Sequence, residues 1–162
     1  MAKKQMTIEQ LVFSMFQSVS LPPTNEENQI LGISKLNILK RRRFANVYGT
    51  LVLFLIRLSL PGAFPAYSRE LVETFDRYFQ IAYKNAPASK EKIEERLVKF
   101  QELTKIEEQE PFLGLALYIT ELFEQRSRKL AYAAKLNNRI EDMLLNFLKM
   151  GENIDIIDIK EG

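Results

Sequence analysis

The chain has 162 residues, of which 46% are hydrophobic and 27% charged, so it is long enough to bury the core of one domain. Its formal net charge is only +2, and it contains no His and no Cys. The composition therefore excludes a disulfide framework, zinc, iron–sulfur and His-ligated haem sites, and catalysis by Cys–His or Ser–His groups.

The first two helices are predicted by capping boxes, in which a Thr and a Gln or Glu three residues later satisfy each other's backbone N–H groups. Thr7 with Gln10 opens a helix whose apolar residues recur at helical spacing, and a Pro-Pro pair ends it. Thr24 with Glu27 opens a second, short helix that ends at Leu31.

A long helix is predicted from about Ser34 to Leu60, with Pro61-Gly62 as its end. Its second half, Leu51–Leu60, is apolar on almost every side, which is typical of a buried core helix, a protein interface or a membrane-inserted helix. The 13 residues of Phe44–Ile56 are fewer than the ~20 that a membrane span needs, which favours a core helix. The apolar residues at helical spacing are Leu36, Leu39, Phe44, Val47, Leu51, Phe54, Leu55 and Leu58.

The remaining helices are predicted from caps and prolines. Ser68 and Ser89 are the expected caps of a third and a fourth helix, and Glu110-Pro111 starts a fifth. This fifth helix is expected to bend at Asn137-Asn138, or to stop and restart there, and to end before Gly151 as its C-terminal glycine.

The tail after this helix is rich in Ile residues spaced by Asp, which predicts a short extended segment. No second strand is expected in the chain, so the tail either docks on the sheet edge of a partner or frays. The predicted fold is all-α, a single helical bundle of about five to six helices over residues 1–152, with 153–162 as a flexible or partner-docking tail.

One stretch of the chain concentrates positive charge. No acidic residue occurs between Glu27 and Glu70, whereas residues 70–125 carry 12 acidic and 7 basic residues. On a helical wheel, Lys35 and Arg42 lie opposite the apolar sector, and Arg41 and Arg43 flank it. The basic residues of this stretch are Lys35, Lys40, Arg41, Arg42, Arg43, Arg57 and Arg69.

A second acid-free run lies between Glu124 and Glu141. If this run is helical, Arg128, Lys135 and Arg139 fall on one side of the helix, opposite its apolar residues. The basic residues of this second run are Arg126, Arg128, Lys129, Lys135 and Arg139.

Concentrated Lys and Arg are typical of a surface for phosphates, and the alternative is an ordinary solvated helix face. Phe44 and Tyr48 lie beside the first cluster, where they stack on bases or, more simply in the case of Phe44, pack in the core. The acidic clusters have no His or Asp-x-Asp pattern nearby, so we expect no metal, no cofactor and no catalytic residue. The candidate nucleic-acid-binding residues are Lys35, Lys40, Arg41, Arg42, Arg43, Arg126, Arg128, Lys129, Lys135 and Arg139.

The segments ISKLNILKRRRFANVYG at 33–49 and RSRKLAYAAKLNNR at 126–139, on an all-helical chain of this size, resemble the small helical subunits of CRISPR effector complexes. The resemblance implies a non-enzymatic subunit that repeats along a ribonucleoprotein and lines the path of a nucleic-acid strand. It further implies phosphate contacts without base specificity, made by Arg41, Arg42, Arg43, Arg128 and Arg139.

The expected partners are therefore single-stranded DNA or RNA, other protein subunits and further copies of the chain. The beginning of the chain lacks the cleavage pattern of a signal peptide, and we expect a cytoplasmic protein that does not insert into a membrane. Two alternatives remain open. One is a helical adaptor that binds partners through Leu51–Leu60 or the Ile-rich tail, and the other is a peripheral protein whose basic run contacts anionic lipid.

Overall fold

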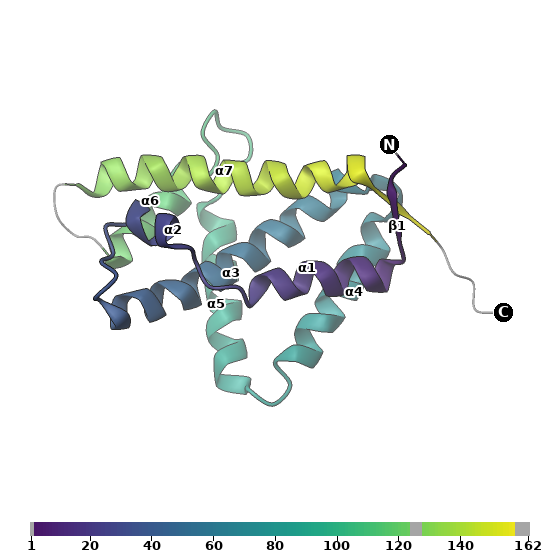
Figure 1. Cartoon of the computed structure of the whole chain (residues 1–162), viewed down its shortest axis with the longest axis horizontal. Coiled ribbons are helices and arrows are strands. Elements are labelled where there is room, and N and C mark those ends of the chain that lie inside the picture. Colours follow the sequence, from purple (N-terminus) through teal and green to yellow (C-terminus); the bar gives the residue numbers. More distant parts are fainter. Residues whose placement is uncertain (1, 124–127, 158–162) are drawn as a thin grey trace.

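The structure is a computed structural model that describes residues 2–123 and 128–157 (Figure 1). In these two stretches the chain forms seven α-helices, one 3-10 turn at Pro65–Tyr67 and two short strands. The expectation of a mostly helical, all-α protein is confirmed. The bounds are β1 Lys4–Met6, α1 Ile8–Val19, α2 Asn25–Ile30, α3 Ile38–Ala63, α4 Ser68–Ala82, α5 Pro87–Leu103, α6 Leu113–Phe123, α7 Lys129–Asn153 and β2 Ile154–Ile156.

Helix α3 is the centre of the fold, since it packs against α1, α4, α5, α6 and α7. Figure 1 shows α7 running along the length of the molecule, and α4 and α5 descending together to a short turn. Every residue from Thr50 to Ile56 is buried, so the core-helix interpretation of this segment is confirmed. Among the described residues, α3 is the one helix with the length and composition of a membrane span, but 67% of its most apolar part is buried inside the protein.

The predicted starts of the helices are partly right. Both capping boxes are present. The Thr7 and Thr24 hydroxyl oxygens each accept the backbone N–H three residues later, and each Thr backbone N–H donates to the side-chain oxygen of that same residue, Gln10 or Glu27. The two predicted Ser caps are wrong. Ser68 is the first residue of α4 and makes no capping bond, and α5 begins at Pro87, before Ser89. Proline suits a first helical turn because its φ is already helical and its missing N–H would have no partner there.

Helix α3 differs from its prediction at both ends. It begins at Ile38 rather than Ser34, because the Asn37 side chain accepts the Lys40 N–H at 3.1 Å and caps it. It continues through Pro61 to Ala63. A proline in the last turn removes a single helical hydrogen bond, so the helix can continue past it for a short distance. Here α3 ends two residues after Pro61, slightly later than predicted.

Helix α7 is continuous through Asn137-Asn138, where a bend or a restart was expected. Asn lowers helix propensity by only a few tenths of a kcal/mol, which is less than the gain from burying a continuous apolar face. The expected fifth helix is interrupted earlier, because α6 runs from Leu113 to Phe123 and α7 starts at Lys129. Gly151 lies inside α7 and not beyond its end, so its prediction as a C-terminal glycine is wrong.

The two ends of the described chain pair with each other. β1 and β2 form a parallel ladder in which Lys4 lies opposite Ile154 and Met6 opposite Ile156. The Ile157 N–H donates to the Met6 carbonyl at 2.9 Å. The expectation that the Ile-rich segment has no partner strand inside the chain is therefore wrong. Three residues of β1 are too few for a strand pattern to be recognised in the sequence.

Candidate nucleic-acid interface

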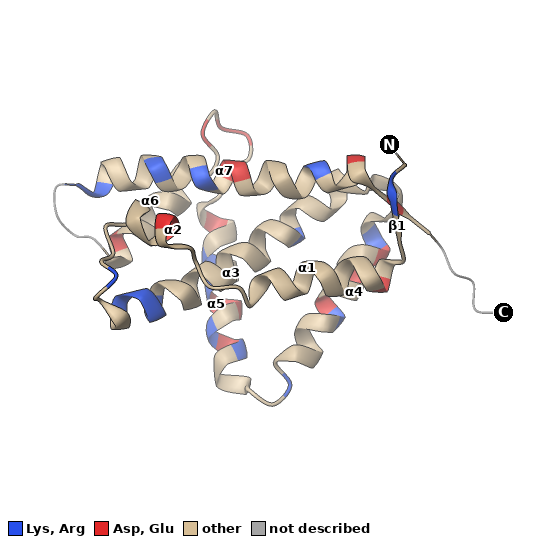
Figure 2. Cartoon of the chain, in the orientation of Figure 1, with Lys and Arg blue, Asp and Glu red and all other residues tan. Residues whose placement is uncertain are grey.

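The two basic runs come together at one end of the molecule. Lys and Arg residues at the starts of α3 and α7 lie at the left of Figure 2. Arg41 Nη2 donates to Asn25 Oδ1 of α2 at 2.7 Å, and Arg139 of α7 bonds to Glu27 of the same helix. Helix α2 therefore joins the two basic starts. We call this region the basic end, and its described candidate residues are Lys35, Lys40, Arg41, Arg42, Arg43, Arg128, Lys129, Lys135 and Arg139.

At the start of α3, the basic side chains contact neutral groups. The Lys40 Nζ donates to the Phe123 carbonyl at 3.1 Å, where α6 ends and its carbonyls have no helical partner. The Arg41 guanidinium bonds to an Asn amide, and Arg43 lies over the Phe123 ring at 5.7 Å from its centroid. These contacts orient the side chains without cancelling their charge. Arg42 and Lys35 are exposed and have no ion pair among the described residues.

The placement of these cations does not favour the helix that carries them. The N-terminal end of a helix has a partial positive charge, so nearby cations are disfavoured by about 0.3–1 kcal/mol each in the first turn. Lys40 lies in the first turn of α3, followed by Arg41, Arg42 and Arg43, and this turn contains no acidic residue. The four cations together therefore destabilise the start of α3 despite the individual contacts of Lys40, Arg41 and Arg43, which makes the cluster the strongest candidate for binding an external anion.

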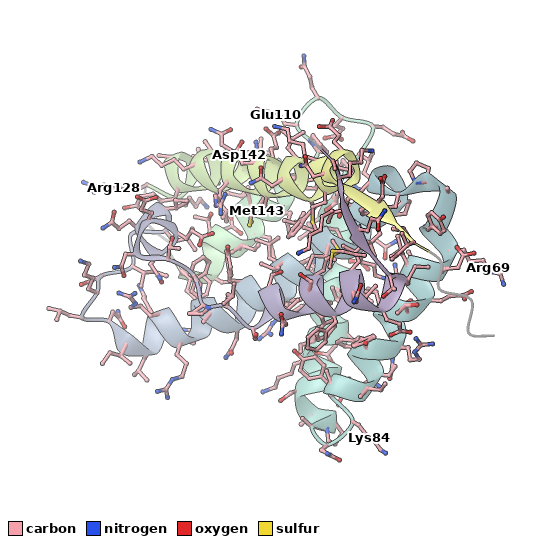
Figure 3. All side chains as sticks on the ribbon, turned by 45° about the vertical axis from the view of Figure 1, so that its right-hand side comes forward. Arg69, Lys84, Glu110, Arg128, Asp142 and Met143 are labelled. Carbon is pink, nitrogen blue, oxygen red and sulfur yellow. The ribbon has the colours of Figure 1, made fainter. Side chains whose placement is uncertain are left out.

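The second basic run is partly neutralised. Lys129 pairs with Glu121 of α6 at 3.4 Å, and Arg139 pairs with Glu27 at 3.2 Å. Arg128 and Lys135 are exposed and have no carboxylate partner among the described residues, and Figure 3 shows Arg128 at the free end of α7. Arg126 lies outside the described residues.

Glu27, Tyr48 and Arg139 form a cluster that the sequence did not indicate. The Tyr48 hydroxyl donates to Glu27 Oε2, the oxygen that also receives the Arg139 Nε–H. Burial alone would raise the pKa of Glu27, but hydrogen bonds from the Thr24 N–H and Tyr48, together with the charge of Arg139, leave this pKa below its ordinary value. Burial and the Glu27 carboxylate raise the pKa of Tyr48. The cluster fastens α2 to α3 and α7 beneath the basic end.

The structure corrects the assignment of aromatic side chains to base stacking. Phe44 is 1% exposed and Tyr48 is 8% exposed, so neither ring is available to a base. The large apolar residues that the surface presents here are aliphatic: Leu36 is 92%, Ile38 65% and Leu39 73% exposed. Leu36 and Leu39 belong to the apolar spacing of the predicted helix, but they lie at or before the first turn of α3, beyond the part of the helix that reaches the core.

In the described part of the chain, no group of three or more Asp or Glu residues is arranged to hold a metal ion. Comparisons with protein-family models, curated proteins and solved structures find no match to this chain.

Proposed function

We propose that the protein binds single-stranded DNA or RNA through the phosphate backbone, without enzymatic activity, at the basic end of a single helical bundle. The observation that supports this best is the start of α3, where residues 40–43 are four consecutive cations with no carboxylate partner within residues 2–123 and 128–157. Successive phosphates offer a matching row of negative charge, and Arg128 and Lys135 extend the cationic surface onto α7.

Binding of this kind is tolerant of sequence. Lys and Arg contacts to phosphates carry no base readout, and the two aromatic rings beside the cluster are buried and do not stack on bases. By the resemblance described above, we place the protein as a small subunit of a cytoplasmic ribonucleoprotein, together with other protein subunits. Purification of the native complex, with identification of the nucleic acid and proteins that accompany the chain, tests this assembly.

Salt dependence tests the phosphate contacts. We expect fluorescence anisotropy of a labelled oligonucleotide to show affinity falling with salt at a log–log slope of about −0.7 per contact. The variant Lys35→Ala/Arg42→Ala/Lys135→Ala removes three exposed cations without an ion pair in the described structure, so its fold is retained and its slope is shallower by about 2.

The matched control is Lys84→Ala/Lys92→Ala/Lys149→Ala, which removes three exposed lysines outside the basic end, and Figure 3 shows Lys84 at the turn between α4 and α5. This control changes the net charge equally and keeps the wild-type slope if binding is localised. Equal slopes for the two triple variants would remove the basic end from the binding site.

A helical adaptor is the second candidate function, and the exposed Leu36, Ile38 and Leu39 favour it. Exposed aliphatic side chains contribute little to phosphate binding, but they are typical of a protein contact. An absence of oligonucleotide binding at low salt would favour this second function.

A further inference from the structure

Three aliphatic side chains project from the basic end. Leu36, Ile38 and Leu39 lie in and just before the first turn of α3, and we call them the aliphatic tip. The cationic Lys35 and Arg42 flank them and are exposed as well. Adjacent large apolar residues left in water mark a contact surface, and their cationic neighbours favour a contact with an acidic rim.

An acid-rimmed groove lies elsewhere on the molecule, between α3, α5 and the loop after α5. Its volume is about 720 Å³, which is within the range of ligand sites. The apolar residues that line it include Phe54, Leu58, Leu97, Val98 and Ile106. Val98 and Ile106 are 58% and 68% exposed, so the groove presents apolar surface to the solvent.

The lining of this groove has an excess of negative charge. Glu107 and Glu108 line it together with Lys105, and the surrounding residues 102–110 contain four Glu against this one Lys. Arg57 also lines the groove, but it is bound by two hydrogen bonds to Asp76, at 2.9 and 3.1 Å, which neutralises its charge. We call this feature the acidic groove, and Figure 3 shows Glu110 of its loop well away from Arg128 at the basic end.

We propose that the aliphatic tip of one copy of this chain inserts into the acidic groove of another copy. Apolar side chains meet an apolar lining, and Lys35 and Arg42 meet Glu107 and Glu108. This inference goes beyond nucleic-acid binding. It shares Lys35 and Arg42 with the proposed phosphate surface, but the aliphatic tip and the acidic groove belong to this contact alone.

The tip does not reach the groove of its own molecule. Leu39 and Phe54 are 15 residues apart on one continuous helix, which separates them by about 22 Å along the axis. The contact is therefore made between molecules and is heterologous, with different surfaces on the two partners. Repetition of such a contact produces a ring or an open chain of molecules.

Sedimentation velocity without nucleic acid tests this contact at protein concentrations from about 1 µM to about 500 µM, which detects dissociation constants in the micromolar range. We expect the wild type to form species larger than dimers as concentration rises. The tip variant Leu36→Ser/Leu39→Ser and the groove variant Glu107→Lys/Glu108→Lys are each expected to remain monomeric. All four substitutions are at exposed positions, so the fold is retained.

Mixing the two variants gives the sharper result. The groove variant has an intact tip and the tip variant has an intact groove, so an equimolar mixture retains one productive contact. We expect a one-to-one dimer and no larger species. A control, Ile81→Ser/Leu145→Ser, removes two exposed aliphatic residues elsewhere and is expected to associate like the wild type.

Three outcomes would each overturn the proposal. They are a wild type that stays monomeric at every protein concentration, a mixture of the two variants that forms no dimer, and a control variant that loses association as the tip and groove variants do. If the wild type is monomeric, binding to vesicles that contain phosphatidylglycerol, lost in the tip variant, would assign the tip to a lipid surface instead. None of these outcomes depends on nucleic-acid binding, so the two proposals fail independently.

Discussion

At the scale of one residue, Tyr48 lies beside the basic cluster in the sequence but stabilises the fold instead of facing a ligand. Its hydroxyl donates to a carboxylate on Glu27, which is 6% exposed. Replacing Tyr48 with Phe leaves that buried oxygen without one of its donors, so we expect unfolding free energy to fall by about 1–3 kcal/mol. Urea unfolding measures this change. Tyr67→Phe, at a half-buried Tyr whose hydroxyl makes no hydrogen bond in the described structure, is the control and is expected to change stability little.

The lowered pKa of Glu27 also makes the free energy of unfolding depend on pH. Because its pKa is lower in the folded protein than its ordinary value of 4.5, the unfolded chain binds the proton more readily. The stabilisation is therefore fully present above about pH 5.5 and is lost as pH falls below 4.5 and through the lowered folded pKa. Urea unfolding of wild type and Glu27→Gln between pH 3 and 7 tests this. The stability difference should narrow in acid, and a constant difference would contradict the assignment.

At the scale of elements, the contact between the ends of α3 and α7 depends on a glycine. A Cβ at Gly151 would lie 2.0 Å from the Ala63 carbonyl oxygen, which forces the two helices apart. A Cβ at Gly49, in the middle of α3, would lie 3.4 Å from the Val19 carbonyl, an ordinary contact. Both glycines are helical, so helix propensity alone predicts that Ala stabilises each position.

We therefore expect the two substitutions to have opposite signs. Gly49→Ala should raise the unfolding free energy by up to about 1 kcal/mol, through helix propensity. Gly151→Ala should lower it by about 1–3 kcal/mol, because the backbone of α3 must shift. Thermal or urea unfolding measures both. Stabilisation by Gly151→Ala would show that the helix ends separate easily.

At the scale of the whole molecule, charge is segregated in space as well as in sequence. The α3 start and the exposed Arg128 and Lys135 lie at one end, and the Glu-rich stretch of residues 102–110 lies elsewhere (Figures 2 and 3). A net charge of +2 conceals this division. Separated charge produces a directed electrostatic field, and on the two proposals above we expect this field to steer an anionic strand to one end and to orient copies of the chain toward each other.

The sequence by itself determined the helical character, both Thr capping boxes and the central core helix. These are local or periodic properties, since a cap needs residues three apart and burial leaves a recurring apolar pattern. It also located the positive charge, because the absence of acids between residues 28 and 69 is a matter of composition.

Only the tertiary structure decided which of those charges are paired and which apolar residues are buried. Arg139 and Glu27 are 112 residues apart, yet they pair, and β1 pairs with β2 across almost the whole chain. Leu36 and Leu39 share the apolar spacing of α3 but lie outside the core, because Leu36 precedes the helix and Leu39 lies in its first turn, beyond the part that the other helices cover. Pairing and burial depend on where distant elements pack, and local spacing does not encode that placement.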